Sequence, residues 1–356
     1  MKSKVYFISV NNSDDMQAIK QKFARLLKES RLLDFIRKDD KVAVKMHFGE
    51  EGNTGYVLPE YVRVACENII ERQATCFLSD TNTLYRGKRM NPQDHLKLAH
   101  EHGFTQEACA VNIVIADDTN KENVAEITIN QKFIKVAKVI KLFLQVDALV
   151  SIAHFKGHIM TGFGGALKNI GMGCAARKGK LAQHSDIAPY VIVEKCIACK
   201  ECIKTCPAQA ILIKNKKAFI DPTKCLGCAS CIAACRQNAI EVNWEAGGSN
   251  MPEKMVEYAL AVLENKLKKS AFINFAVKIT KECDCLAKDD PRIVPDVGIL
   301  ASVDPVSIDK ASLDLVNRTA GKDIFKEAHP LRNGFKQLEH AYNLGLGNLE
   351  YELLEL

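Results

Sequence analysis

The first half of the chain alternates short apolar runs with longer segments in which apolar residues recur every three or four positions. Short apolar runs between turn residues are typical of buried strands, and the longer recurrence is typical of helices packed on a sheet. The pattern predicts strands at residues 5–10, 41–48, 74–79, 111–116 and 148–153, with a hairpin edge at 126–129. It predicts helices at residues 14–37 (capped by Ser13), 59–72, 92–102 and 136–145.

The same alternation returns after residue 250, beyond a glycine-rich loop segment and a cysteine-rich block. It predicts a helix at 252–269, strands at 271–279 and 297–301, and helices at 305–318 and near 335–344. This C-terminal part, of about 110 residues, would barely support a core of its own. We therefore predict an α/β fold whose mostly parallel sheet domain, residues 1–190 and 246–356, is interrupted by a small α+β insert at residues 191–245. Three domains in series is the alternative.

Eight of the 14 cysteines fall within 40 residues, at one spacing that is used twice. Each half reads Cys-x-x-Cys-x-x-Cys-x-x-x-Cys: three closely spaced thiolates suit one cubane, and the fourth turns toward the other cubane. Zinc knuckles and disulfides are the alternatives, but tetrahedral zinc sites have no use for such a run. We therefore predict two 4Fe-4S clusters, one held by Cys196, Cys199, Cys202 and Cys235, the other by Cys225, Cys228, Cys231 and Cys206.

Residues 191–243 resemble a bacterial two-cluster ferredoxin domain. Pro207 follows the fourth cysteine, and each half continues into a short apolar strand, at residues 210–213 and 239–242. Arg236 stands where the first half has Pro207, which leaves the ligands unchanged but removes the proline from the second turn.

Composition limits where such a protein works. With 356 residues and 47% hydrophobic content, the chain is long enough for two domains with a real core. No run approaches the roughly 18 apolar residues of a membrane span, and the first residues lack the apolar core of a signal peptide. We expect a soluble, cytoplasmic protein whose cysteines serve metal and thiol chemistry rather than disulfides.

The net charge of +6 is concentrated in part on the predicted insert. Residues 191–243 carry eight basic side chains against four acidic ones. A basic surface beside electron-transfer clusters would attract an acidic redox partner such as a small ferredoxin, although a solvated lysine face without a partner is equally compatible. The basic residues are not interleaved with exposed aromatic residues and no recognition motif is present, so we expect no nucleic-acid partner.

Polar residues follow several predicted strands. Ligands of an open parallel sheet bind outside the carboxyl ends of its strands, so these residues are candidates for a substrate or cofactor site. The candidate site residues are Lys45, Asp80, His154, His158, Lys168, Cys283, Cys285 and Asp304, with Lys156 as an additional cation.

Each group of candidates has a chemical role and a simpler alternative. The lysines would hold an anionic group, and the histidines would bind a metal or an anion or move protons; a solvated histidine pair is the alternative. The aspartates would orient neighbours or bind a cation. The glycine-rich run at 162–169 would wrap an anion through backbone N–H groups, or simply pack. Cys283 and Cys285, with Cys174 as a further thiol, would bind an additional metal or form a redox pair, or remain free cysteines.

Together these segments resemble family 362 of the domains of unknown function. Members of its iron–sulfur branch carry a two-cluster ferredoxin module inside the domain, so the resemblance implies the insertion architecture; it implies no substrate. The segments that carry the resemblance are Lys45, Asp80, residues 154–158, residues 164–169, residues 283–285, and residues 304–306 with Asp309.

The leading functional prediction is an iron–sulfur oxidoreductase. Its two clusters would relay electrons one at a time to a substrate, or to a second metal or redox cofactor, in the α/β crevice. A non-enzymatic electron carrier, with the α/β part as a docking domain, is the first alternative. A maturation factor that hands on a metal or cluster through Cys283 and Cys285 is the second.

Overall fold

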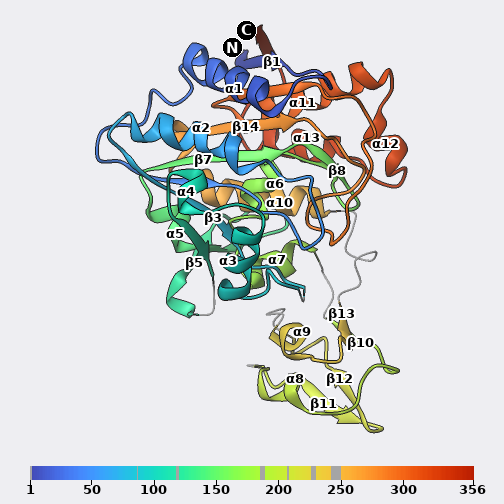
Figure 1. The fold of residues 1–356 in the computed structure, drawn as a ribbon. Helices are drawn as coiled ribbons and strands as arrows, with labels where there is room; N and C mark the ends of the chain where they lie inside the picture. The colour runs from blue at the N-terminus through green and yellow to red at the C-terminus, as the bar shows by residue number, and fades with distance from the viewer. Residues whose placement is uncertain are drawn as a thin grey trace.

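A computed structural model describes residues 2–85, 87–117, 120–184, 189–206, 208–225, 230–241 and 250–356. At the centre of the large body in Figure 1 is an eight-stranded sheet in the order β16-β1-β15-β14-β7-β2-β3-β4. Five of its seven pairings are parallel, and the two that involve β15 are antiparallel. The predicted α/β class with a mostly parallel sheet is therefore confirmed. The strands are β1 (Ser3–Ser9), β2 (Lys41–Lys45), β3 (Thr75–Thr81), β4 (Ile113–Ala116), β7 (Ala148–His154), β14 (Ser270–Ala276), β15 (Gly298–Ser302) and β16 (Tyr351–Glu355).

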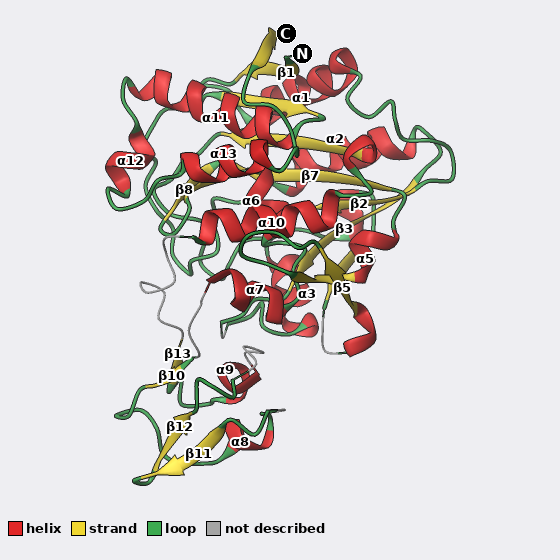
Figure 2. Ribbon diagram, turned by 180° about the vertical axis from the view of Figure 1, so that it is seen from behind, coloured by secondary structure: helices red, strands yellow, loops and turns green. Residues whose placement is uncertain are grey.

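Helices cover both faces of this sheet, so that its strands are buried on two sides. Val42 and Val44 of β2 belong to one hydrophobic core, and Ala43 between them belongs to the other. The first core is completed by α1 (Met16–Ser30), α2 (Pro59–Ile70) and α4 (Gln106–Cys109). The second, seen from behind in Figure 2, is completed by α6 (Ala166–Gly171), α10 (Met251–Leu263), α11 (Pro305–Ala320) and α13 (Phe335–Asn343).

None of the helices in the described ranges is long and apolar enough to cross a membrane. Four further helices lie around these layers. They are α3 (Pro92–Glu101), α5 (Lys141–Gln145), α7 (Arg177–His184) and α12 (Ile324–Ala328).

The cysteine-rich part has its own secondary structure. The β10 strand (Tyr190–Val191) pairs with β13 (Ile240–Glu241), and β11 (Ile211–Lys214) pairs with β12 (Lys217–Ile220), both antiparallel. With α8 (Glu201–Lys204) and α9 (Ser230–Ala234) these strands form the small unit of Figure 1. The β7 and β14 strands lie before and after this unit in the sequence, yet they pair side by side in the large sheet.

Several elements differ from the sequence predictions. Residues 136–140 form the strand β6 (Val136–Ile140), which pairs with β5 (Val124–Thr128); only α5 of the predicted helix is helical. Buried Ala137 and Val139 alternate with more exposed neighbours, which is a strand period that the apolar content of the segment concealed. The first helix is capped by Asp15, not Ser13, and ends before Arg31, whose φ of 54° is left-handed.

The glycine-rich segment also contains regular structure that its composition did not predict. Its residues include the short antiparallel strands β8 (Lys156–His158) and β9 (Gly162–Gly164), followed by α6 and α7. The strand β16 likewise was not predicted; it pairs with β1 and brings the two ends of the chain together (Figure 1).

Close packing of α6 on α10 gives a testable consequence. A Cβ atom at Gly171 would lie 2.1 Å from the carbonyl oxygen of Met255, a backbone atom of α10. We expect Gly171→Ala to lower the free energy of unfolding by roughly 1–3 kcal/mol, measured by urea denaturation. In the exposed control Gly87→Ala the new Cβ would first meet the Glu50 side chain at 3.5 Å, an ordinary van der Waals distance, and we expect a change below about 0.5 kcal/mol. Equal stability of the two variants would contradict this packing.

Candidate functional site

Four neighbouring parallel strands, β14, β7, β2 and β3, end at the same edge of the sheet. Lys45 and His154 are the last residues of β2 and β7, and Asp80 is the last but one of β3. The loop after β14 carries Cys283 and Cys285. The structure thus brings these five predicted residues to one edge.

Lys45 and Asp80 form a buried ion pair, with 2.9 Å between Nζ and Oδ1. Burial alone would raise the pKa of Asp80, but the positive charge of Lys45 and its cationic neighbours holds that pKa below its usual value. The ammonium group also donates to the Met46 carbonyl at 2.8 Å and to Asn169 Oδ1 at 3.0 Å. All three N–H groups of Lys45 are therefore used within the protein, and its influence on a ligand would be through charge.

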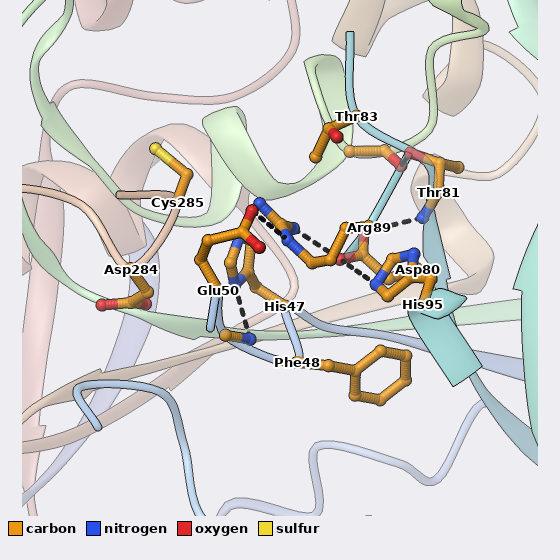
Figure 3. Close-up of polar contacts among 12 residues, drawn as sticks. His47, Phe48, Glu50, Asp80, Thr81, Thr83, Arg89, His95, Asp284 and Cys285 are labelled. Atoms are coloured by element: carbon orange, nitrogen blue, oxygen red, sulfur yellow. Dashed lines mark hydrogen bonds and ion pairs between the residues drawn. The ribbon is translucent and has the colours of Figure 1, made fainter. Parts of the chain in front are cut away.

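Arg89 connects this pair to the cysteine loop. Figure 3 shows its guanidinium between two carboxylates. It lies 3.0 Å from Glu50 and 3.5 Å from Asp80. The same guanidinium donates to Tyr85 Oη at 2.7 Å, and Tyr85 Oη donates to the Cys285 carbonyl at 2.7 Å. Arg89, Glu50 and Tyr85 were not predicted because no motif marks them; their position in loops after predicted strands was the available signal.

His154 is oriented by a carboxylate that was also not assigned a role. Its Nδ1 lies 2.8 Å from Asp284 Oδ1, and Lys156 Nζ lies 3.1 Å from the other oxygen. Burial would raise the pKa of Asp284, but His154 and Lys156 hold it well below its usual value. A carboxylate only accepts, so Nδ1 donates to it and Nε2 is the ring nitrogen that Asp284 does not hold. This nitrogen is buried and has no hydrogen-bond partner within the described ranges, so it is available to a proton or a metal.

Cys283 and Cys285 form a hydrogen-bonded pair beside a lysine. Cys283 Sγ accepts from Lys168 Nζ at 3.4 Å and from the backbone N–H of Cys285 at 3.4 Å. The hydrogen bond from the Cys285 thiol lowers the pKa of Cys283 well below its usual value and, despite burial, the charge of Lys168 acts in the same direction. Cys283 is therefore the more acidic member of the pair.

His158 lies next to this pair. One ligand atom each from His158, Cys283 and Cys285 falls within 4.8 Å of the others, which is compatible with a small metal site. The His158 Nδ1 accepts backbone N–H groups from Met160 at 3.2 Å and Thr161 at 3.1 Å. Burial lowers the pKa of His158 well below its usual value, so the ring is neutral with its proton on Nε2. Cys174 is not part of this group but belongs to the second hydrophobic core, the one that contains α6 and α10.

The glycine-rich run is fixed by a buried carboxylate from α11. Asp309 accepts the backbone N–H groups of Ala166 at 2.7 Å and Leu167 at 2.9 Å, and the amide of Asn274 at 2.8 Å. These two backbone groups, which were expected to wrap an anion, therefore already bind a carboxylate of the protein. Burial raises the pKa of Asp309 to about 6. The bonds fix the start of α6, which carries Lys168 toward the cysteine pair.

Asp304 does not join the other candidates, contrary to expectation. The β15 strand is antiparallel to β14, so Ser302 at its end pairs with Phe272 near the start of β14. Asp304 instead caps α11: its Oδ1 accepts the backbone N–H groups of Val306 and Ser307, both at 2.8 Å. The sequence prediction assumed a parallel strand, and the strand direction puts Asp304 at the opposite edge.

The cysteines of the small unit line two cavities. One cavity is lined by Cys196, Cys199, Cys202 and Cys235, and the other by Cys206, Cys225 and Cys231; Cys228 and Pro207 lie outside the described residues. Of these, Cys196, Cys199, Cys202 and Cys206 are free cysteines.

Backbone N–H groups point at several of these sulfurs. Ala218 donates to Cys196 Sγ at 3.3 Å, Ala210 to Cys206 Sγ at 3.3 Å, and Ala239 to Cys235 Sγ at 3.2 Å. The last two bonds join equivalent positions of the two cysteine runs, because each donor lies four residues after the fourth cysteine. Such N–H···S bonds stabilise negative charge on sulfur.

Comparison with known proteins places the chain in context. The family described as "Domain of unknown function (DUF362)" matches residues 42–314. Among solved structures, the lactate racemase apoprotein from Thermoanaerobacterium thermosaccharolyticum is similar at 15% identity and a TM-score of 0.38, over 76% of this chain and 50% of that one. A Thermotoga maritima protein is similar at 14% identity and a TM-score of 0.38, over 94% of this chain and 60% of that one. The chain thus spans half to three fifths of those proteins, and no curated protein matches it.

The buried ion pair predicts a large stability loss when one partner is removed. Asp80→Asn leaves Lys45 buried without its compensating charge, while Arg89 keeps its ion pair with Glu50. We expect the free energy of unfolding to fall by about 3–5 kcal/mol. Asp34→Asn breaks ion pairs of a carboxylate that is 39% exposed, so solvent screening should keep the loss below about 1 kcal/mol. Urea denaturation measures both, and equal losses would contradict the importance of the buried pair.

Asp309 predicts a pH dependence. Its pKa is about 6 in the folded protein against an ordinary value of 3.8, so the folded state binds the proton more tightly. Its stabilising contribution is complete below pH 3.8 and is lost as pH rises through about 6. The free energy of unfolding of the wild type, measured relative to that of Asp309→Asn, should therefore rise by roughly 1 kcal/mol when the pH is lowered from about 7.5 to about 5. Urea denaturation at both values tests this; a constant difference would assign Asp309 an ordinary pKa.

Proposed function

We propose, from the premise that this chain belongs to the DUF362 family, that it is an iron–sulfur oxidoreductase. Two 4Fe-4S clusters in residues 191–245 would relay single electrons to an anionic substrate at the carboxyl edge of the large sheet. The family description assigns no activity, so the proposal rests on the residues of this chain.

The arrangement of the cysteines is the observation that carries the proposal. Cys235 is 33 residues from Cys202 in the sequence, yet it lines the same cavity as the first three cysteines. Cys206 correspondingly lines the cavity of Cys225 and Cys231. This exchange of the fourth cysteine is the pattern of two-cluster ferredoxins, and thiolates with backbone N–H donors are the ligands that such clusters require. Clusters held there would supply one-electron transfer.

The candidate site supports an anionic substrate because four cations, Lys45, Arg89, Lys156 and Lys168, converge there. Burial, together with the charges of Arg89, Lys156, Lys168 and Lys45, lowers the pKa of His47 well below its usual value, so His47 adds no charge of its own. Lys168 and Lys156 would hold the anionic group, with Lys45 adding its charge from the ion pair. A low-dielectric site with several fixed cations attracts anions strongly.

His154 would move a proton to or from the substrate. Asp284 holds the ring through Nδ1, and Lys156 holds Asp284 in turn. This is the arrangement that activates a general base, because the carboxylate stabilises the imidazolium that forms. His158 and the cysteine pair would complete the site, and Asp80 would act indirectly by orienting Lys45.

The electron donor would be an acidic protein such as a small ferredoxin. The small unit carries more basic than acidic residues. The ion pairs among its described residues are exposed and weak, so they leave the basic side chains accessible to a partner. These pairs join Lys195 to Glu241, Lys204 to Glu201 and Lys224 to Asp221. A net positive surface would steer an acidic partner toward the clusters.

A maturation factor is the second candidate function. It is favoured by the proximity of His158, Cys283 and Cys285, which could hold a metal or cluster in transit. A protein that hands on metal would bind it at this trio in addition to the metal of the small unit.

Anaerobic reconstitution tests the proposal. We expect about eight iron and about eight sulfide per chain, with an EPR signal after reduction by dithionite. Cys235→Ser should lose one cluster, with about half of the iron and a simplified EPR spectrum, because Cys235 completes a single cavity. Cys109→Ser, at a buried cysteine of the main core, is the matched control and should keep both clusters.

Other outcomes would separate the alternatives. A colourless protein that holds only zinc after reconstitution would overturn the proposal. Iron beyond the two clusters, nickel, zinc or a flavin would indicate a further centre in the large domain. Metal that is transferred from the Cys283 and Cys285 loop to another protein would favour the maturation factor.

A further inference from the structure

The cysteine pair after β14 differs from every other part of the candidate site in being able to change its covalent state. Cys283 and Cys285 are separated by one residue, and their sulfur atoms lie within 4.8 Å of each other. A disulfide needs about 2.05 Å between the sulfurs, so the two side chains must move toward each other for the bond to form.

We propose that Cys283 and Cys285 are a disulfide–dithiol pair that accepts the electrons delivered by the clusters. This inference rests on the proposed function and names the acceptor within that site. In the reductive step two electrons arrive one at a time from the low-potential iron–sulfur donor, which is oxidised, and the S–S bond breaks. One proton binds Cys285 Sγ, and Cys283 remains a thiolate beside Lys168. The dithiol can then reduce a disulfide or another two-electron acceptor in the crevice.

The surroundings favour a thiolate over a metal ion. Lys168 Nζ lies 3.4 Å from Cys283 Sγ, so a cation bound to that sulfur would sit next to an ammonium group. His158 uses Nδ1 as an acceptor for two backbone N–H groups and therefore carries its proton on Nε2, where a metal would need a lone pair. N–H donors toward a sulfur stabilise its negative charge, which the pair carries during reduction.

A chain of contacts joins the small unit to this pair. Ile232 follows Cys231 in α9 and packs against Leu84 and Leu181 of the large domain. Leu84 is bonded to Tyr85, whose Oη donates to the Cys285 carbonyl at 2.7 Å. In both views α9 is the part of the small unit that faces α7 (Figures 1 and 2). The second cavity, lined by Cys231, is therefore the one from which electrons would leave.

The chain provides a matched pair of cysteines without this environment. Cys66 in α2 and Cys76 in β3 are also hydrogen-bonded to each other. The Cys76 thiol and burial raise the pKa of Cys66 well above its usual value, and the charged neighbour is Glu67 rather than a lysine. This pair should remain two unreactive thiols.

A redox titration of the reconstituted full-length protein tests the proposal. The protein is equilibrated anaerobically with mixtures of oxidised and reduced dithiothreitol, alkylated, and analysed by peptide mass spectrometry. We expect the peptide with Cys283 and Cys285 to change between doubly alkylated and internally bridged forms with one two-electron midpoint. Cys66 and Cys76 should be alkylated only after unfolding, at every ratio.

Electron counting separates this proposal from the cluster proposal. With both clusters present, the oxidised wild type should accept about two more electrons than Cys283→Ser/Cys285→Ser, whose cluster EPR signals should be unchanged. Absence of clusters in the wild type would overturn the proposed function instead. Clusters with no bridged peptide, or a stoichiometric metal ion that is lost in Cys283→Ser, would overturn the inference.

The contact route has its own variant. Ile232→Ala should keep both cluster signals while reduction of the disulfide by dithionite-reduced clusters slows several-fold. Leu212→Ala, at an exposed residue of β11, is the control and should leave that rate unchanged. An unaltered rate in Ile232→Ala would overturn the assignment of the second cavity as the point of exit.

Discussion

Charge compensation below the carboxyl edge of the sheet is the constraint on which the site depends. Lys45 lies at the end of a central strand with a side chain that is 1% exposed, and it is tolerable there because Asp80 of the next strand faces it. Arg89 extends the compensation to Glu50, and through Tyr85 to the cysteine loop. The network keeps strand ends and loops in one arrangement, because separating any partner would leave a buried charge alone.

The backbone of the glycine-rich segment is positioned by steric and polar constraints from outside it. Gly157 lies so close to the backbone of Lys281 that a Cβ atom would be 2.1 Å from the Lys281 carbonyl oxygen. This close contact places β8 against the cysteine loop. Asp309 holds the start of α6 from the other side. The consequence is that Lys168, His158 and Cys283 come from three segments yet meet within a few ångströms. This convergence is what makes a thiolate centre chemically reasonable there.

In the proposed function the two parts of the molecule contribute different chemistry. The small unit would handle single electrons, and the large domain would supply cations, an oriented histidine and a two-electron thiol pair. Electrons that pass from a one-electron carrier to a two-electron acceptor need a contact between the two parts. The contact of Ile232 with Leu84 and Leu181 joins the small unit to the large domain. The boundaries of the insert and the identity of the clusters remain predictions of the sequence, and metal analysis tests the clusters.

The sequence by itself determined what local patterns encode. Strand and helix periods identified the α/β class, the double cysteine run defined the cluster prediction, and residues following strands pointed to Lys45, Asp80 and His154. Tertiary structure decided what depends on strand direction and on distant partners. Asp304 lies at the opposite edge of the sheet because β15 runs antiparallel to β14. Residues 136–140 form a strand because they pair with β5. Tertiary structure also supplied Arg89 and Asp284, because the partner of a buried charge is chosen by the spatial proximity of loops, which no local pattern records.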